Sequence, residues 1–318
     1  MSMSDKEVLT ELKKDGPDQL IKDVTKRGVD FEMTPDFEKK LRKAKATDEV
    51  IKAVTNASPK ARAAAAKSAE LGAGTVQLSA AETKDFNALK DELDPDKAIS
   101  LAEAYLKQYP QSQVLSYIYS FEANAYQQKG DVVKDVDLCE KSLDLMKDNL
   151  MSLLMVTYAI PQPQYIKGHQ TDEEKQLATA EAYAQDAFKV IDGLKKPSNE
   201  SDEDFAKRKA SYTAGIHGSL GMVHLDRAQL GLMGIDKEEL AKAEKEYQLA
   251  VTTVDRPDSR DYYRLGETYR LEGKLDDAIA AFTKASELGG GSGIKEFADR
   301  QIELCKQMKA QAATAPKP

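Results

Sequence analysis

Hydrophobic and polar residues follow one another along most of this chain with the three- and four-residue spacing of amphipathic helices. The spacing is most regular over residues 258–290, where the pattern consists of Tyr262, Leu265, Gly266, Tyr269, Ala278, Phe282 and Ala285. Gly273 falls between the two halves of the pattern and predicts a turn. We therefore expect two short antiparallel helices that approach closely at the small residues Gly266 and Ala278.

The same order of residues recurs upstream, which predicts further helical hairpins over residues 79–110, 116–147, 151–191 and 220–250. Two of these hairpins are stretched, because residues 161–170 and 228–237 are inserted between their helices. Ser79 with Glu82 and Thr171 with Glu174 have the spacing of capping boxes, which start helices. Asp135 stands where the pattern has a small apolar residue elsewhere.

Residues 258–290 resemble a tetratricopeptide repeat (TPR), with Tyr262 in place of the Trp that most often opens the family's pattern. A single hairpin of this kind cannot bury its own apolar face, so such repeats stack. The resemblance implies an all-α fold: a TPR-type solenoid of about five units over residues 79–293. Residues 294–312 predict a capping helix, because Ile294, Phe297, Ile302 and Cys305 form an apolar stripe. Residues 313–318 predict a disordered tail.

The first 56 residues predict a separate small helical module, which can be interpreted as a duplicated hairpin, followed by a linker over residues 57–78. Ser4 with Glu7 and Thr34 with Pro35 predict helix starts, and Gly16 with Pro17 predicts a break. Residues 27–35 resemble part of a short module found ahead of TPRs in some bacterial proteins. Its expected core contains Val8, Leu9, Leu12, Leu20, Ile21, Val24, Phe31, Phe37, Leu41, Val50, Ile51 and Val54.

The charge of the chain argues against nucleic-acid binding. The formal net charge is −8, and residues 1–67 hold 15 basic and 12 acidic side chains against 31 and 42 in the remainder. A solenoid that binds a nucleic-acid backbone needs a predominantly basic surface.

Cysteines and targeting signals add little to this picture. Cys139 and Cys305 both fall on apolar helical positions, so we expect buried free thiols rather than the alternative of a disulfide. Neither a signal peptide nor an apolar stretch long enough to span a membrane is recognisable, which favours a cytoplasmic protein without membrane insertion. A mature exported fragment behind a new methionine would look the same.

No catalytic, cofactor-binding or metal-binding constellation emerges from the sequence. His217 and His224 lie seven residues apart on one helix face, which permits a metal pair, but they occupy the places of Tyr262 and Tyr269 and are expected to pack. A third histidine, His169, has no such partner. Gly215, Gly218 and Gly221 lie inside a helical pattern without a preceding strand, so they predict close helix packing rather than a phosphate loop.

The TPR resemblance implies that the first helices of successive units line a concave groove. Candidate groove residues are those that packing between the helices leaves available: Tyr117, Asn124, Met151, Leu154, Tyr158, Met222, Leu225, Arg260, Tyr263, Arg264, Glu267 and Arg270. Such an aromatic and Met-rich surface suits an extended apolar peptide or an amphipathic helix. Arg260 and Arg264 resemble part of the clamp with which some TPRs hold a terminal carboxylate. Alternatively, the stretched loops or the N-terminal module cover these residues.

Three hypotheses follow for function. The first is a non-enzymatic scaffold that binds a protein or peptide in the groove, and the second is a self-associating subunit of a homo-oligomer. An enzyme is the least supported, and a deep polar pocket with convergent ionisable groups would favour it.

Overall fold

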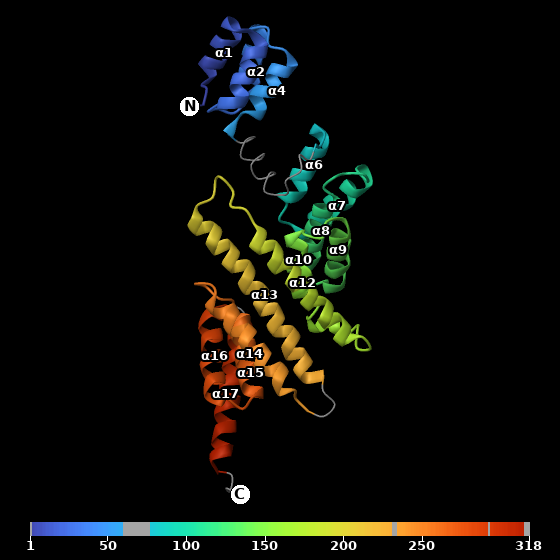
Figure 1. Ribbon diagram of the computed structural model, residues 1–318, viewed down its shortest axis with the longest axis vertical. Helices are drawn as coiled ribbons and strands as arrows, with labels where there is room; N and C mark the ends of the chain where they lie inside the picture. The colour runs from blue at the N-terminus through green and yellow to red at the C-terminus, as the bar shows by residue number, and fades with distance from the viewer. Residues whose placement is uncertain (1, 60–76, 231–233, 292, 315–318) are drawn as a thin grey trace. The chain divides into compact units, whose positions relative to one another are not determined.

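Every regular element in the described part of the chain is an α-helix. The computed structural model describes residues 2–59, 77–230, 234–291 and 293–314. By internal contacts the chain divides into two compact units, one of residues 1–75 with 197–199 and one of residues 76–196 with 200–318. The expected all-α class of stacked helical hairpins is confirmed (Figure 1).

The N-terminal unit contains helices α1 (Asp5–Lys14), α2 (Gly16–Arg27), α3 (Pro35–Lys43) and α4 (Asp48–Asn56). Its helix starts follow the sequence, because Ser4 and Glu7 form a reciprocal capping box and Thr34 accepts a hydrogen bond from the amide of Phe37. Eight of the expected core residues are buried: Val8, Leu12, Leu20, Val24, Phe37, Leu41, Val50 and Val54. A bridge between Met3 and Val29 also ties the start of the chain to the residues after α2.

The second unit is a row of helical hairpins, each pairing a first helix with a second one. The pairs are α6 (Ala80–Lys90) with α7 (Pro95–Gln108), α8 (Leu115–Gln128) with α9 (Val132–Leu145), α10 (Leu150–Ala159) with α12 (Glu173–Gly193), α13 (Asp202–Leu230) with α14 (Lys237–Thr252), and α15 (Ser259–Leu271) with α16 (Leu275–Gly289). Helix α17 (Gly293–Thr314) closes the row against α15 and α16. The first helices also contact one another from α6 through α8, α10, α13 and α15 to α17, so they share one face of the array.

Close approach between helices depends on glycine, as the sequence predicts. A Cβ atom added to Gly266 would lie 2.7 Å from the ring of Phe282, and one added to Gly221 would lie 2.6 Å from the ring of Tyr247. Both rings are fully buried. The glycines therefore let an aromatic side chain of each second helix lie directly on the backbone of its first helix.

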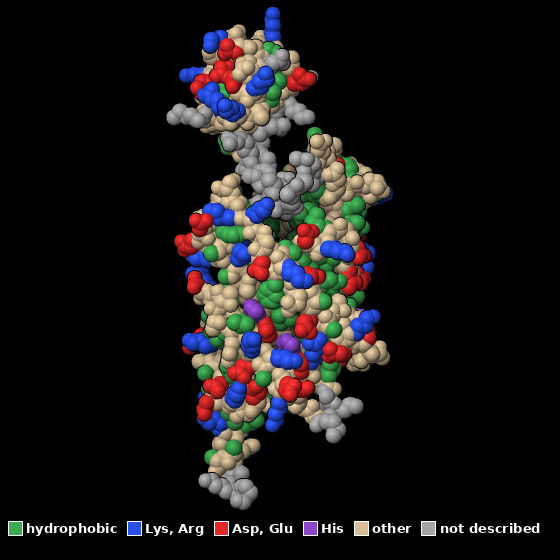
Figure 2. Space-filling model, viewed as in Figure 1, with side chains coloured by type: hydrophobic (Ala, Val, Ile, Leu, Met, Phe, Trp, Pro, Cys, Tyr) green, Lys and Arg blue, Asp and Glu red, His purple; other side chains and the backbone are tan. Residues whose placement is uncertain are grey.

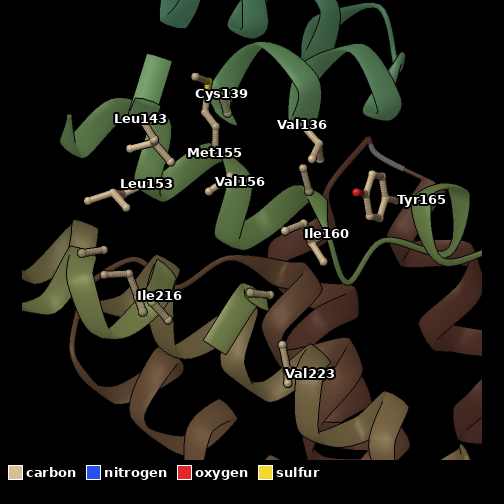
Figure 3. Packing of buried hydrophobic residues seen from close by; sticks show 14 of the residues in the cluster. Val136, Cys139, Leu143, Leu153, Met155, Val156, Ile160, Tyr165, Ile216 and Val223 are labelled. Carbon is tan, nitrogen blue, oxygen red and sulfur yellow. The ribbon is translucent and has the colours of Figure 1, made fainter. Parts of the chain in front are cut away.

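The core of the array is apolar and continuous from one hairpin to the next. Figure 3 shows side chains from α9, α10 and α13 meeting there, among them Leu143, Met155 and Ile216. Cys139 belongs to the same core, and both cysteines are buried and free, as expected.

The first inserted segment packs into this core. Helix α11 (Pro163–Ile166) contacts α9, and Tyr165 and Ile166 are buried (Figure 3). The expected capping box at Thr171 is wrong, because α12 begins at Glu173 and its N-cap residue, Asp172, makes no capping hydrogen bond through its side chain. The segment thus packs into the core, and its Gln162 also contacts the first helices, with Nε2 3.2 Å from the carbonyl of Tyr158 and 3.8 Å from the sulfur of Met222.

Helix α13 departs most from the expectation. The insertion at residues 228–237 is predicted to lengthen this helix at its C-terminal end and then to turn at Gly231 and Gly234. Helix α13 does continue through Ala228 to Leu230, but it gains most of its length by starting at Asp202. The predicted turn at Gly231 lies outside the described residues, whereas Gly234 has the positive φ of a turn (115°). The 29 residues of α13 therefore extend past the end of its partner α14, which has 16 (Figure 1).

Candidate functional site

A groove runs along α13. It encloses about 850 Å³ and is bordered by α13, the C-terminal end of α14, the N-terminal half of α15 and Tyr158 of α10. Four of the twelve candidate groove residues line it: Tyr158, Met222, Arg260 and Arg264. The groove thus lies on the face that the first helices share.

Small side chains on α13 make the floor of the groove. Ala206, Ala210, Ala214 and Gly218 follow one another at four-residue intervals and therefore lie on one side of the helix. Gly215 belongs to the same floor, and a Cβ atom added there would meet no heavy atom within 4 Å. A ligand can therefore approach the backbone of α13 closely along this floor.

Arg260 spans the groove from α15 to α10. Its Nε and Nη2 atoms donate hydrogen bonds to the carboxylate of Asp258 (3.0 and 2.5 Å), which fixes the guanidinium. Nη1 donates to the hydroxyl of Tyr158 at 2.8 Å, and the guanidinium carbon lies 5.5 Å from the centroid of that ring. The guanidinium that resembles part of a carboxylate clamp is therefore already held by a carboxylate of this chain.

Asp261 and Arg264 form the charged wall of the groove. Both are partly buried, and neither side chain makes a hydrogen bond or an ion pair within 4 Å with any described residue. Burial, together with the nearby charge of Asp258, raises the pKa of Asp261 to about 7. Burial opposes the charge of Arg264, but Tyr247, Glu267 and Asp226 outweigh it and raise the pKa of Arg264. The wall thus presents one carboxyl group and one guanidinium without a direct partner.

A second set of polar groups lies between α13, α14 and α15. Burial raises the pKa of Asp226 to about 7 and also raises the pKa of Glu267. The hydroxyl of Tyr247 is fully buried and has no hydrogen-bond partner among the described residues. These groups make the interior between α13, α14 and α15 polar.

The remaining candidate groove residues are divided between core and surface. Tyr117 and Leu225 are buried, while Met151 and Leu154 are partly buried against the core of the array. Tyr263 packs edge-on to the ring of Phe282 at 5.4 Å. Asn124, Glu267 and Arg270 are partly exposed on α8 and α15.

Sequence reasoning missed Asp261 and the floor of α13. The four-residue spacing of Ala206, Ala210, Ala214 and Gly218 was the available signal, since it continues a small-residue stripe upstream of the glycines. No sequence pattern marked Asp261 as a groove residue, because its place depends on Gly218, 43 residues earlier. A Cβ atom at Gly218 would lie 2.6 Å from Oδ1 of Asp261, so only a glycine there leaves room for the carboxylate.

The histidines of α13 bind carboxylates of α14. Nδ1 of His217 lies 2.6 Å from Oε2 of Glu246, and Nδ1 of His224 lies 2.7 Å from Oε2 of Glu239. They therefore join the two helices of one hairpin, as packing residues do. Within the described ranges, no group of three metal-ligating side chains has the geometry to hold a metal ion.

The groove does bring ionisable groups together, which is the feature that would favour an enzyme. Its hydroxyl groups, however, are not arranged as activated nucleophiles. Ser219 donates its hydrogen bond to the carbonyl of Gly215, and Ser211 makes no hydrogen bond to a described base. Neither serine therefore has the adjacent base that activates a hydroxyl group for nucleophilic attack.

Comparison with known proteins gives a distant structural likeness. The chain is similar to a thermophilic TPR protein of Thermus thermophilus, with 20% sequence identity and a TM-score of 0.43, over 70% of this chain and 100% of that chain. No protein-family model matches the sequence, and no curated protein matches it. In the described part of the chain, no helix is both long and apolar enough to cross a membrane.

Proposed function

We propose that this protein is a non-enzymatic scaffold that binds a segment of a partner protein, as a peptide or an amphipathic helix, in the groove along α13. The groove itself is the observation that carries the proposal. From Ala206 to Met222 its floor is about 24 Å long at 1.5 Å per helical residue. That length matches about seven residues of extended peptide or about four turns of helix.

The character of the surface supports a protein ligand rather than a nucleic acid. The groove combines a small-residue floor with Tyr158, Met222 and side chains of both charges. Acidic and basic side chains are also interspersed over the face of the array drawn in Figure 2. A mixed surface of this kind fits a polypeptide, whereas a nucleic-acid backbone requires one dominant positive sign.

Site-specific photocrosslinking in cells that naturally produce the protein tests the proposal. A photoreactive side chain at Ser211 lies in the groove, and one at Lys245 lies on exposed α14 outside it. We expect a discrete protein adduct at position 211 and none at position 245. Equal adducts at both positions, or none at 211, would rule out the groove as the binding surface.

Self-association is the second candidate function, and the capping helix favours it. Phe297 is 52% exposed and Leu304 is 41% exposed, and their spacing of seven residues places them on one side of α17. Light scattering over a range of concentrations tests this candidate. If the protein self-associates through α17, Phe297→Glu should lower its apparent mass. A strict monomer at every concentration, with scattering that Phe297→Glu leaves unchanged, would remove this candidate.

A further inference from the structure

Asp261 is a groove carboxylate that the charges of Arg260 and Arg264 reach only without direct contact. Its carboxyl group lines the groove with no hydrogen bond or ion pair to a described residue. One of its oxygens lies against the backbone of α13, where a Cβ atom at Gly218 would come within 2.6 Å. A partly buried carboxylate in this position has lost much of its water without gaining a cationic partner.

The neighbouring cations act on Asp261 without contacting it, and each also has other partners. Arg260 is bound by Asp258 and Tyr158. Arg264 lies in the field of two other carboxylates, Asp226 and Glu267.

Each of the other cations near the wall has a carboxylate as a partner or as a sequence neighbour. Arg270 acts on Glu267, and Lys207 at the rim is paired with Glu203. Asp255 and Arg256 enter the groove as neighbours of opposite sign. Asp261 is therefore the partly buried carboxylate of the groove to which no described cation binds directly.

The space beside Asp261 suits a long, unbranched side chain. The floor there consists of Ala214, Gly215 and Gly218, and Gly215 has no heavy atom within 4 Å of the place of a Cβ. The aliphatic stem of a lysine or arginine can lie along such small residues while its charged end reaches a carboxylate.

We propose that the groove selects partner segments that carry a lysine or arginine side chain, which lies on the small-residue floor of α13 and pairs with the carboxylate of Asp261. The inference rests on the proposed function, because it names the chemistry of the segment that the groove binds. The group that the groove prefers is thus a cation, whereas the carboxylate clamp of some TPRs holds a terminal carboxylate.

Two blocked peptides serve as probes: acetyl-Ala-Ala-Lys-Ala-Ala-amide, and the same peptide with norleucine in place of lysine. Binding to the full chain is followed by the NMR shifts of amides in α13 and α15. We expect the lysine peptide to bind at least about tenfold more tightly, as for a charge-assisted hydrogen bond. Asp261→Asn keeps the shape of the side chain and should abolish the preference. Asp255→Asn, at the exposed rim of the same groove, should retain it.

Equal affinity for the two peptides overturns the inference, as does a preference that survives Asp261→Asn or no detectable preference at millimolar concentration. These outcomes are separable from those of the crosslinking experiment. An adduct at Ser211 without a lysine preference leaves the scaffold function standing and removes only the role of Asp261. No adduct together with a lysine preference that depends on Asp261 removes the protein partner and keeps the cation site.

Discussion

Replacing glycine by alanine at two positions of α13 is expected to change the stability of the protein in opposite directions. A Cβ atom at Gly215 would meet no heavy atom within 4 Å, whereas one at Gly221 would lie 2.6 Å from Cε1 of Tyr247. Tyr247 is fully buried, so its ring has no free space into which to move.

The magnitudes follow from these surroundings. Alanine in a helix interior is favoured over glycine by about 0.5–1 kcal/mol, so Gly215→Ala should raise the free energy of unfolding by that amount. The same gain at Gly221 is opposed by overpacking, which costs about 1–3 kcal/mol. The net loss expected for Gly221→Ala therefore lies between about 0 and about 2.5 kcal/mol.

Urea unfolding followed by circular dichroism measures both changes. Gly215→Ala is the matched control, since it makes the same chemical change on the same helix. If Gly221→Ala raised the free energy of unfolding as much as Gly215→Ala does, the packing of Tyr247 on α13 would be refuted.

Two further predictions concern buried polar groups in the middle of the array. Burial raises the pKa of Asp135 from 3.8 to about 6. The free energy of unfolding therefore falls as the pH rises from 3.8 to about 6, because only the unfolded chain ionises freely there, and below pH 3.8 this loss is absent. The free energy of unfolding of Asp135→Asn, relative to that of the wild type, should therefore grow by about 1.4 kcal/mol between about pH 5 and pH 8. An equal difference in the free energy of unfolding at both pH values would contradict the prediction. Asp137→Asn is the control, because Asp137 is exposed. Asn149 caps α10, and its Nδ2 atom, which carries two hydrogens, lies 2.8–3.1 Å from three buried serine hydroxyls. Asn149→Ala should therefore lower the free energy of unfolding by about 2–4 kcal/mol in urea titrations. A loss below about 1 kcal/mol would mean that the network adds nothing to the cap.

The hairpins were predictable because their signals are local. Gly266 with Phe282, and Ser4 with Glu7, act within one hairpin or one helical turn, and the structure forms both contacts. The same reasoning reached Gly221, which lies against the ring of Tyr247 as a packing glycine should.

The groove was less predictable because it depends on residues far apart in the chain. Arg260 and Tyr158 are in contact although 102 residues separate them in the sequence, and neither segment carries a sequence pattern that predicts this contact. Met222 was expected on an open surface, yet it is 3% exposed, because it belongs to a core cluster and Gln162 of the inserted segment lies 3.8 Å from its sulfur. The start of α13 at Asp202 was missed for another reason: the added turns follow no repeat.

The affinity of the partner crosslinked at Ser211 for two variants of Gly215 tests the scaffold proposal most directly. Because Gly215 lines the groove and has open space around it, Gly215→Trp should fill the groove without disturbing the core, whereas Gly215→Ala should leave the groove open. In calorimetric titrations we expect the alanine variant to bind as the wild type does and the tryptophan variant to bind at least about a hundredfold more weakly. Equal binding by both variants would contradict the account, since a ligand that tolerates a filled groove does not lie in it.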